Sequence, residues 1–264
     1  MSVAASAKRL LAPAAKTLAP RLFWRRKYRI LQRLGQSRPD VELVRSLCDP
    51  GRVSLDIGAD VGEFAIAMLT SSRSVIAFEP RPAQARDLTT MFDAVGAPVR
   101  VEAVALSDTP GVTAMRVVES DPGRSTIDHE NVLDTAVGGP VQTIDVAVKR
   151  LDDLQLDNIG LVKIDVEGHE LAVLRGALDT LERNQPTIVV EAEERHHARA
   201  VADITELLAG LGYLGYFNLD SGRRPIEEFD AAQHQNPANI TGAEDDWATR
   251  GVYVNNFVFL PKGG

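Results

Sequence analysis

The chain has a single cysteine, Cys48, among its 264 residues, which excludes an intramolecular disulfide framework. One thiol is typical of a reducing compartment, and we interpret Cys48 as a small buried hydrophobic residue. No apolar run approaches the ~20 residues that a membrane-spanning helix needs, and Pro13, Lys16 and Pro20 interrupt any secretory signal. We therefore expect a cytoplasmic protein that is soluble or peripheral to a membrane, with a transit peptide as the open alternative.

Acidic residues are absent from the first 38 positions. Ten of the 29 basic residues lie in Met1–Arg38. The rest of the chain contains the other 19 basic residues and all 37 acids, so its net charge is −18. Such an acidic body argues against a general nucleic-acid binder. Apolar residues interleave with the charges of residues 1–38, which predicts a basic amphipathic arm that contacts a membrane or a partner. The alternative is a helix packed on the domain.

Residues 39–264 are expected to form a single α/β domain, because the apolar fraction of 44% and the charged fraction of 25% are ordinary for a globular protein. Strand–helix alternation predicts a doubly wound, mostly parallel sheet. The strands that we expect are Val53–Ile57, Ser74–Phe78, Val99–Val104, Leu161–Val166, Thr187–Glu191, Tyr213–Leu219 and Val252–Leu260. The expected helices are Pro39–Leu47, one from Glu63, one that carries Leu88, Glu170–Leu181 and Ala198–Leu208.

Two stretches depart from this alternation. Residues 107–148 predict a β-rich insertion near the ligand edge, with extended segments at Val112–Val118 and Val141–Val148 around a polar loop, Asp121–Gly139. Residues 221–250 form a long polar connection, which we interpret as an acceptor lid, with disorder as the alternative.

The stretch Val53–Gly62 has the pattern of a cofactor loop after a buried first strand. A strand, a glycine turn and a helix in this order place backbone N–H groups and the positive end of a helix dipole at the strand's carboxyl end. The dinucleotide fingerprint Gly-x-Gly-x-x-Gly is absent, since Gly58 and Gly62 lie four positions apart. Asp56 and Asp60 would repel a pyrophosphate and favour a cationic ligand without phosphate. A nicotinamide oxidoreductase is therefore disfavoured.

Glu79 ends the second expected strand about 20 residues further on, where an acid can accept hydrogen bonds from both hydroxyls of a ribose. Pro80 keeps Glu79 extended. A nucleoside with a positive centre and no phosphate points to S-adenosylmethionine.

Five motifs occur in an order that resembles the FkbM-type methyltransferases, between about Val53 and Glu191. They are Asp56–Gly62, Ala77–Pro80, Ala105–Asp108, Leu151–Leu154 and Lys163–Glu170, the last reading Lys-Ile-Asp-Val-Glu-Gly-His-Glu. The resemblance implies a class I methyltransferase fold: a Rossmann-like, doubly wound, mostly parallel seven-stranded sheet with an antiparallel edge strand. It also implies S-adenosylmethionine as the donor and a hydroxyl of a sugar, glycolipid or natural product as the acceptor.

By this resemblance Asp56, Gly58 and Gly62 hold the methionine end of the donor and Glu79 holds the ribose. The end of the third strand, about Glu102–Ala105, would line the adenine, so Ala105 joins Asp60 among the expected cofactor residues. The chain departs from the usual family pattern at Asp60, where Asn is frequent, and at His169, where Ala is common.

The segment Lys163–Glu170 carries the candidate catalytic groups. Lys163 and Asp165 share one face of an expected central strand, and buried charges persist when they are paired. We interpret Lys163 as part of a structural ion pair and Asp165 as the better catalytic candidate, because it is nearer the carboxyl edge. His169 is a candidate base, as are Asp165 and Glu167 if their pKa values are raised.

Other acids and histidines, in this segment and beyond it, have different interpretations. Glu170 serves equally well as an acid at a helix N-terminus. We expect no metal, although Asp165, Glu167, His169 and Glu191 are suitable ligand types. His196 and His197 are expected on the surface.

The leading hypothesis is an S-adenosylmethionine-dependent O-methyltransferase that acts on a hydroxylated small molecule or glycan. The alternative, of another class, is a non-catalytic module with the same fold that docks to a membrane or partner through residues 1–38.

Overall fold

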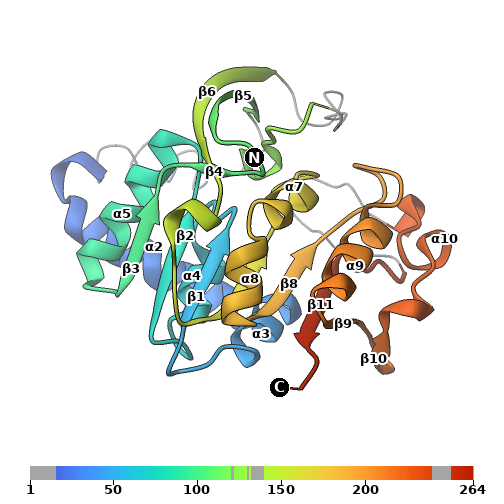
Figure 1. Cartoon of the computed structure of the whole chain (residues 1–264). Helices are drawn as coiled ribbons and strands as arrows, with labels where there is room; N and C mark the ends of the chain where they lie inside the picture. The colour runs from blue at the N-terminus through green and yellow to red at the C-terminus, as the bar shows by residue number, and fades with distance from the viewer. Residues whose placement is uncertain (1–15, 120–121, 130, 132–139, 240–250, 264) are drawn as a thin grey trace.

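The structure, a computed structural model, describes residues 16–119, 122–129, 131, 140–239 and 251–263. Within these residues the centre of the fold is an eight-stranded sheet with the spatial order β10-β9-β11-β8-β7-β1-β2-β3 (Figure 1). Its strands are β1 (Val53–Ile57), β2 (Ser74–Phe78), β3 (Val99–Glu102), β7 (Ile159–Ile164), β8 (Thr187–Glu191), β9 (Tyr213–Leu219), β10 (Gly222–Pro225) and β11 (Asn256–Pro261). The neighbours from β8 to β3 all pair in parallel, which confirms the predicted mostly parallel sheet.

Helices cover both faces of this sheet, so its central strands are buried on both sides. All six residues of β7 are buried, which explains why this strand is apolar apart from Lys163. On one face lie α2 (Pro20–Gly35), α3 (Pro39–Ser46), α4 (Glu63–Met68) and α5 (Pro82–Val95). On the other face lie α7 (Glu170–Arg175), α8 (Leu178–Asn184) and α9 (Ala200–Gly210). The predicted doubly wound architecture is confirmed.

The far edge of the sheet differs in detail from the expectation. β11 is antiparallel to both of its neighbours and lies between β8 and β9 rather than at the edge. The edge strand is β10, which forms an antiparallel hairpin with β9 and brings the described sheet to eight strands instead of seven. The last strand also begins later than predicted, at Asn256 rather than Val252.

The predicted helix Glu170–Leu181 is wrong in one respect, because it is broken into α7 and α8 at Gly176. The break has a packing reason. A Cβ on Gly176 would lie 2.0 Å from the backbone oxygen of Ser107, so the chain that leaves β4 passes directly over this point. The leucine periodicity of the segment gives no sign of that contact.

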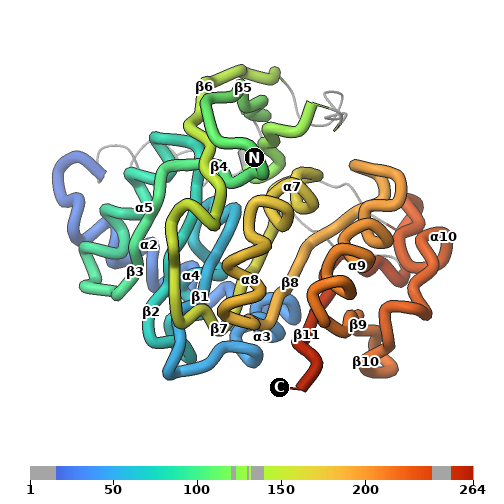
Figure 2. The backbone as a smooth tube through the Cα atoms, viewed as in Figure 1, coloured from blue at the N-terminus to red at the C-terminus, as the bar shows by residue number. Residues whose placement is uncertain are grey.

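In the region of the expected β-rich insertion the structure has a second, three-stranded sheet. Its order is β4-β6-β5, with β4 at Ala105–Leu106, β5 at Gly111–Val118 and β6 at Val141–Lys149. β5 and β6 pair antiparallel along their length. This sheet stands above the carboxyl ends of β1 and β2 (Figure 2). Most of the loop Asp121–Gly139 lies outside the described residues.

The described part of the N-terminal arm forms α2, which packs on the domain. Trp24 is buried between this helix and the apolar residues of α4 and α5, and Arg25 Nε donates to Ala94 O at 2.8 Å. The interpretation as a packed helix is therefore confirmed for Pro20–Gly35. No helix within the described ranges is long and apolar enough to cross a membrane.

The connection 221–250 contains short elements where the structure describes it. Besides β10 they are η3 (Ile226–Glu228), α10 (Ala231–His234) and η4 (Pro237–Asn239). Gln235 ties α10 to the sheet, because its amide group donates to Ala192 O and Val254 O. Residues 240–250 lie outside the described residues, and the lid role stays a prediction.

Candidate active site

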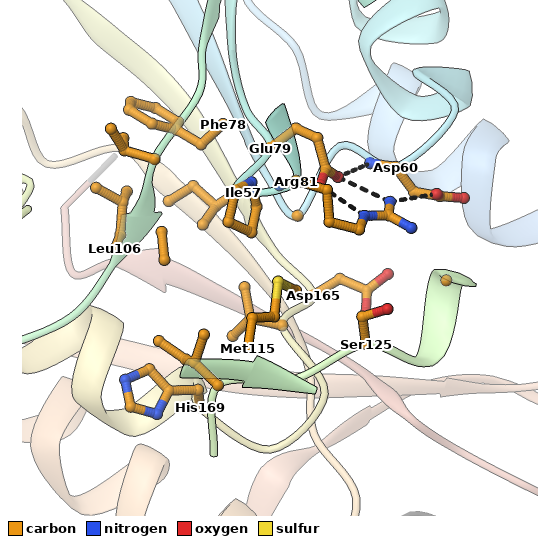
Figure 3. Close-up of a pocket in the computed structure, with 17 residues that line it drawn as sticks. Ile57, Asp60, Phe78, Glu79, Arg81, Leu106, Met115, Ser125, Asp165 and His169 are labelled. Atoms are coloured by element: carbon orange, nitrogen blue, oxygen red, sulfur yellow. Dashed lines mark hydrogen bonds and ion pairs between the residues drawn. The ribbon is translucent and has the colours of Figure 1, made fainter. Parts of the chain in front are cut away.

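A cleft opens at the carboxyl ends of β1, β2 and β7, beneath the second sheet (Figure 3). It encloses about 520 Å³, part of which is open to solvent. One wall is apolar and is formed by Ile57, Phe78, Val104, Ala105, Leu106, Met115, Ile127 and Val166. Polar groups at the cleft are Asp60, Glu79, Arg81, Ser125, Asp165 and His169. Open α/β sheets bind their ligands at this edge, so the cleft is the candidate active site.

The backbone N–H groups of the loop after β1 are already engaged by the protein. Gly58 N and Ala59 N both donate to Phe78 O at 3.0 Å, and Asp60 N donates to Glu79 Oε2 at 3.0 Å. The free N–H groups expected at this turn are therefore absent at these three positions. A phosphate would find no cradle there, which agrees with the argument against a dinucleotide.

The two glycines of the loop are required by packing of the chain itself. Gly58 has a φ of +86°, and a Cβ there would lie 1.8 Å from the backbone oxygen of Asp165. Gly62 has a φ of +87°, and its Cβ would lie 2.8 Å from Leu88 Cδ2. These positions thus let β1 approach β7 and α4 approach α5.

Glu79 lies at the cleft, as predicted, but its carboxylate is fully engaged. Arg81 donates to Oε1 from its backbone N and from Nε, at 2.9 and 2.8 Å, and to Oε2 from Nη2 at 3.0 Å. The same Nη2 lies 2.6 Å from Asp60 Oδ1 (Figure 3). Arg81 therefore bridges two acids that the sequence assigned to the cofactor.

Asp56 does not line the cleft. It is in register with Lys163 on the neighbouring strand and is fully buried. Neither carboxylate oxygen has a hydrogen-bond partner among the residues that the structure describes. Burial raises the pKa of Asp56 to about 6, although the charge of Lys163 acts in the opposite direction. Asp56 thus lies behind the cleft.

Lys163 forms the structural ion pair that the sequence predicted. Its ammonium lies 2.9 Å from Asp165 Oδ2 and 4.0 Å from the centre of the Phe64 ring. Lys163 is completely buried, whereas Asp165 keeps about a quarter of its side chain exposed and lines the cleft. The pair therefore fixes a carboxylate at the carboxyl end of β7.

Glu167 occupies a strained turn that residues of the connection between β5 and β6 support. Its φ is +54°, in the left-handed region, and its carbonyl accepts hydrogen bonds from Thr126 Oγ1 at 2.8 Å and Asn131 Nδ2 at 2.6 Å. Such a conformation persists only when its surroundings enforce it. Burial and the nearby charge of Asp165 raise the pKa of Glu167 to about 8. Its carboxyl group is therefore mostly protonated at neutral pH.

His169 lines the cleft and is held by two polar side chains. Its Nε2 lies 2.9 Å from Ser107 Oγ, and its Nδ1 lies 3.8 Å from Asp128 Oδ2. Burial lowers the pKa of His169, while the charge of Asp128 partly offsets the shift. The imidazole is therefore neutral at pH 7 and able to accept a proton.

The prediction that His196 and His197 lie on the surface is wrong. Both belong to the turns after β8, where His197 Nε2 lies 2.7 Å from Asp128 Oδ2. His196 Nε2 lies 3.5 Å from Glu167 Oε2, and burial lowers the pKa of His196 to about 4. The two imidazoles thus face the catalytic candidates from the β8 side.

Glu170 acts on the turn that precedes its own helix. Its Oε1 accepts from Val166 N at 3.2 Å and from Gly168 N at 3.0 Å. The side chain is buried, and burial raises its pKa to about 7. This supports the interpretation of Glu170 as an acid that satisfies backbone N–H groups.

Glu191 ends β8 and is half-buried, and its charge interacts with that of Asp165. Its Oε1 accepts from Asn255 Nδ2 at 2.7 Å, and burial together with the charge of Asp165 raises its pKa. Within the described ranges, no group of three or more His, Cys, Asp or Glu residues is arranged to hold a metal ion.

Sequence reasoning did not identify Ser107, Asp128, Arg81 or the two histidines as site residues. Ser107 belongs to the motif Ala105–Asp108, and Arg81 lies two positions after Glu79. Their positions in the sequence therefore gave a weak indication that they belong to the site. Asp128 and His197 meet across 69 positions of the chain, and no local pattern predicts that contact.

Comparison with known proteins gives a consistent result. Residues 56–216 match the family model described as the methyltransferase FkbM domain. The chain is 30% identical over 173 residues to the methyltransferase sdnD of Sordaria araneosa, a match that covers 53% of this chain and 66% of that relative. It is 27% identical over 180 residues to the hexuronic acid methyltransferase AglP of Haloferax volcanii, covering 67% and 71% of the two chains.

Among solved structures, the crystal structure of the methyltransferase FkbM from Methylobacillus flagellatus KT is similar with a TM-score of 0.49 and 16% identity. The match covers 80% of this chain and 44% of that chain.

Proposed function

Since the chain belongs to the FkbM methyltransferase family, we propose that it transfers the methyl group of S-adenosylmethionine to a hydroxyl oxygen of a sugar, glycolipid or other natural product. The observation that carries this proposal is a half-buried, neutral imidazole, His169, in the wall of a cleft whose rim is acidic. The name of the Haloferax volcanii relative gives hexuronic acid as its acceptor, which supports a carbohydrate acceptor here.

The groups at the cleft fit this donor. The apolar wall that includes Ala105 and Phe78 suits the flat face of adenine, and the acids at the rim suit ribose hydroxyls and a positively charged methionine end. Asp165 and Asp60 would hold that charged end, and Glu79 the ribose. The arginine in the wall, Arg81, is neutralised by Glu79 and Asp60, so the described part of the cleft does not favour a phosphate.

A ribose at Glu79 competes with Arg81. The carboxylate already accepts hydrogen bonds from three groups of Arg81 and from Asp60 N. Ribose hydroxyls therefore bind there only when the guanidinium releases part of this carboxylate.

When bound, S-adenosylmethionine supplies an electrophilic methyl group on a sulfonium, and the protein aligns the acceptor and takes its proton. His169 is the base. Its Nδ1 faces the Asp128 carboxylate, which favours the tautomer that carries the proton on Nδ1 and leaves the lone pair on Nε2. Nε2 then accepts the hydroxyl proton at the position beside Ser107 Oγ. Asp128 stabilises the imidazolium that forms.

The neighbouring acids have other tasks in this scheme. Glu167 is mostly protonated at neutral pH and is a donor rather than a base. Asp165 is held by Lys163 and faces the cleft as a fixed negative charge. His169 is thus the group best suited to accept a proton.

The test combines donor binding with turnover. We expect calorimetry to show saturable binding of S-adenosylmethionine, and labelled methyl transfer to appear with a member of a panel of sugars, glycolipids and polyketides. His169→Gln should reduce turnover by about 10² to 10⁴ and leave donor binding intact. The exposed histidine His129 provides the matched control, since His129→Gln should change neither. A protein that binds no S-adenosylmethionine at saturating concentrations contradicts the proposal.

A further inference from the structure

The helix α2 has an outer face that the described residues leave uncovered. Its inner face packs through Trp24, which is 3% exposed. On the outer face Leu22, Ile30 and Leu34 are 71%, 47% and 55% exposed. Exposed arginines alternate with these apolar residues, namely Arg26, Arg29 and Arg33. Large apolar side chains seldom gather on a free surface without a partner.

We propose that this outer face of α2, residues 20–35, binds the surface of an anionic lipid bilayer. The partner is a phospholipid membrane, with its negative headgroups at the arginines and its acyl boundary at Leu22, Ile30 and Leu34. This surface is separate from the cleft, so the proposal does not depend on the proposed reaction.

Charge complementarity is the first argument. The helix contains no acid, and among the described residues none of Arg26, Arg29 and Arg33 is paired with a carboxylate. Basic residues close to an anionic membrane each contribute about fivefold to partitioning. Because the rest of the chain carries −18, an anionic surface attracts the arm, repels the body and so orients the protein with α2 toward the lipid.

The apolar residues decide between a membrane and a nucleic acid. A nucleic-acid backbone pairs with arginines and offers nothing for an exposed leucine or isoleucine, whereas the headgroup boundary of a bilayer accepts both. A long nucleic acid that surrounded the protein would also repel its acidic body. On a planar membrane the acidic body faces away from the lipid, so this repulsion is weaker. The alternation of both residue kinds on one face therefore favours lipid.

The helix is already formed and fixed before it meets the membrane. Arg25 Nε is bonded to Ala94 O at 2.8 Å, and Phe23 and Trp24 pack edge to face with ring centres 5.1 Å apart. The ammonium groups of Lys16 and Lys27 lie 5.0 and 5.2 Å from the centre of the Trp24 ring. Binding thus does not require the ordering of a free segment, which commonly weakens amphipathic peptides on membranes.

Sedimentation with lipid vesicles tests the proposal on the full chain. We expect the protein to bind vesicles of phosphatidylcholine mixed with phosphatidylglycerol and to remain free with phosphatidylcholine alone. The triple variant Arg26→Gln, Arg29→Gln, Arg33→Gln should weaken partitioning roughly a hundredfold. The double variant Leu22→Ser, Ile30→Ser should weaken it more than tenfold while the charge is kept.

A matched triple variant with the same charge change, Arg175→Gln, Arg223→Gln, Arg224→Gln, lies away from α2 and should bind as the wild type does. Every variant is first checked for an unchanged circular dichroism spectrum and thermal unfolding midpoint. Equal binding to neutral and anionic vesicles, or wild-type binding by the leucine–isoleucine variant, overturns the proposal. Binding of duplex DNA or RNA in preference to anionic vesicles overturns it too.

Discussion

The guanidinium of Arg81 covers the carboxylate of Glu79, with Nε 2.8 Å from Oε1 and Nη2 3.0 Å from Oε2. Both side chains are at most 10% exposed, so the pair is buried at the end of β2. A carboxylate in this position needs its partner, because an unpaired buried charge is costly.

Removal of Arg81 should therefore destabilise the protein. We expect Arg81→Met to lower the free energy of unfolding by about 3 kcal/mol, since it leaves the charge of Glu79 buried without a cation. Urea denaturation of Arg81→Met, of Glu79→Gln and of the double variant gives the interaction free energy between the two side chains. The double variant should be more stable than the sum of the single effects predicts. Strictly additive effects would show that the two side chains do not interact.

The second prediction concerns His169 and pH. Burial lowers its pKa below the usual 6.5, so the neutral base persists under mildly acidic conditions. The acidic limb of the kcat profile should lie below pH 6.5 and reflect protonation of His169. His169→Gln should reduce kcat by about 10² to 10⁴. An unaltered profile in the variant would identify another group as the base.

Asp128 should act on the reaction through His169. Its charge raises the pKa of His169 and so offsets part of the effect of burial. In Asp128→Asn the acidic limb of the kcat profile should move to lower pH, and kcat should fall because the imidazole is no longer held in one tautomer. The KM for S-adenosylmethionine should change little. A limb that moves to higher pH contradicts this role.

Glu170 gives a prediction about stability and pH. Its pKa is about 7 in the folded protein against 4.5 when unperturbed. Between these values the folded chain retains a proton that the unfolded chain has lost, so the contribution of this group to stability is lost as pH rises from 4.5 to about 7. The loss amounts to about 3 kcal/mol.

The variant Glu170→Gln keeps an oxygen acceptor for Val166 N and Gly168 N and removes the titration. Its stability relative to the wild type should therefore increase with pH across this interval. Urea denaturation at several pH values measures the difference, with the exposed acid variant Glu182→Gln as the control. A constant difference across this range would refute the assignment.

Alanine substitutions at two glycines distinguish the cost of backbone strain from the cost of close packing. Gly58 and Gly96 have similar φ values, +86° and +70°, but a Cβ at Gly58 would lie 1.8 Å from Asp165 O and one at Gly96 would meet nothing within 4 Å. Gly96→Ala should cost about 1 kcal/mol, whereas Gly58→Ala should cost more than about 3 kcal/mol or prevent folding. Thermal unfolding of both variants measures this difference. Equal costs would mean that the approach of β1 to β7 is not tight.

Much of the central sheet was predictable from the sequence. The apolar segments around Leu55, Ile76, Val162 and Val189 are short and separated by helical patterns, and this periodicity predicts a parallel sheet covered on both faces. The pairing of Lys163 with an acid also followed from local information, since alternate residues of a strand share a face. Local patterns failed at the helix break near Gly176, where the reason is a remote backbone oxygen.

The sequence by itself determined the family, the parallel core and the position of the cleft, because motifs at strand ends must gather at one edge of such a sheet. Only the tertiary structure decided which side chains meet there. It turned Asp56 away from the cleft, engaged Glu79 with Arg81, and brought Asp128 to His197 and His169. These relationships depend on contacts between segments far apart in the chain, and the spacing of residues along one segment carries no record of them.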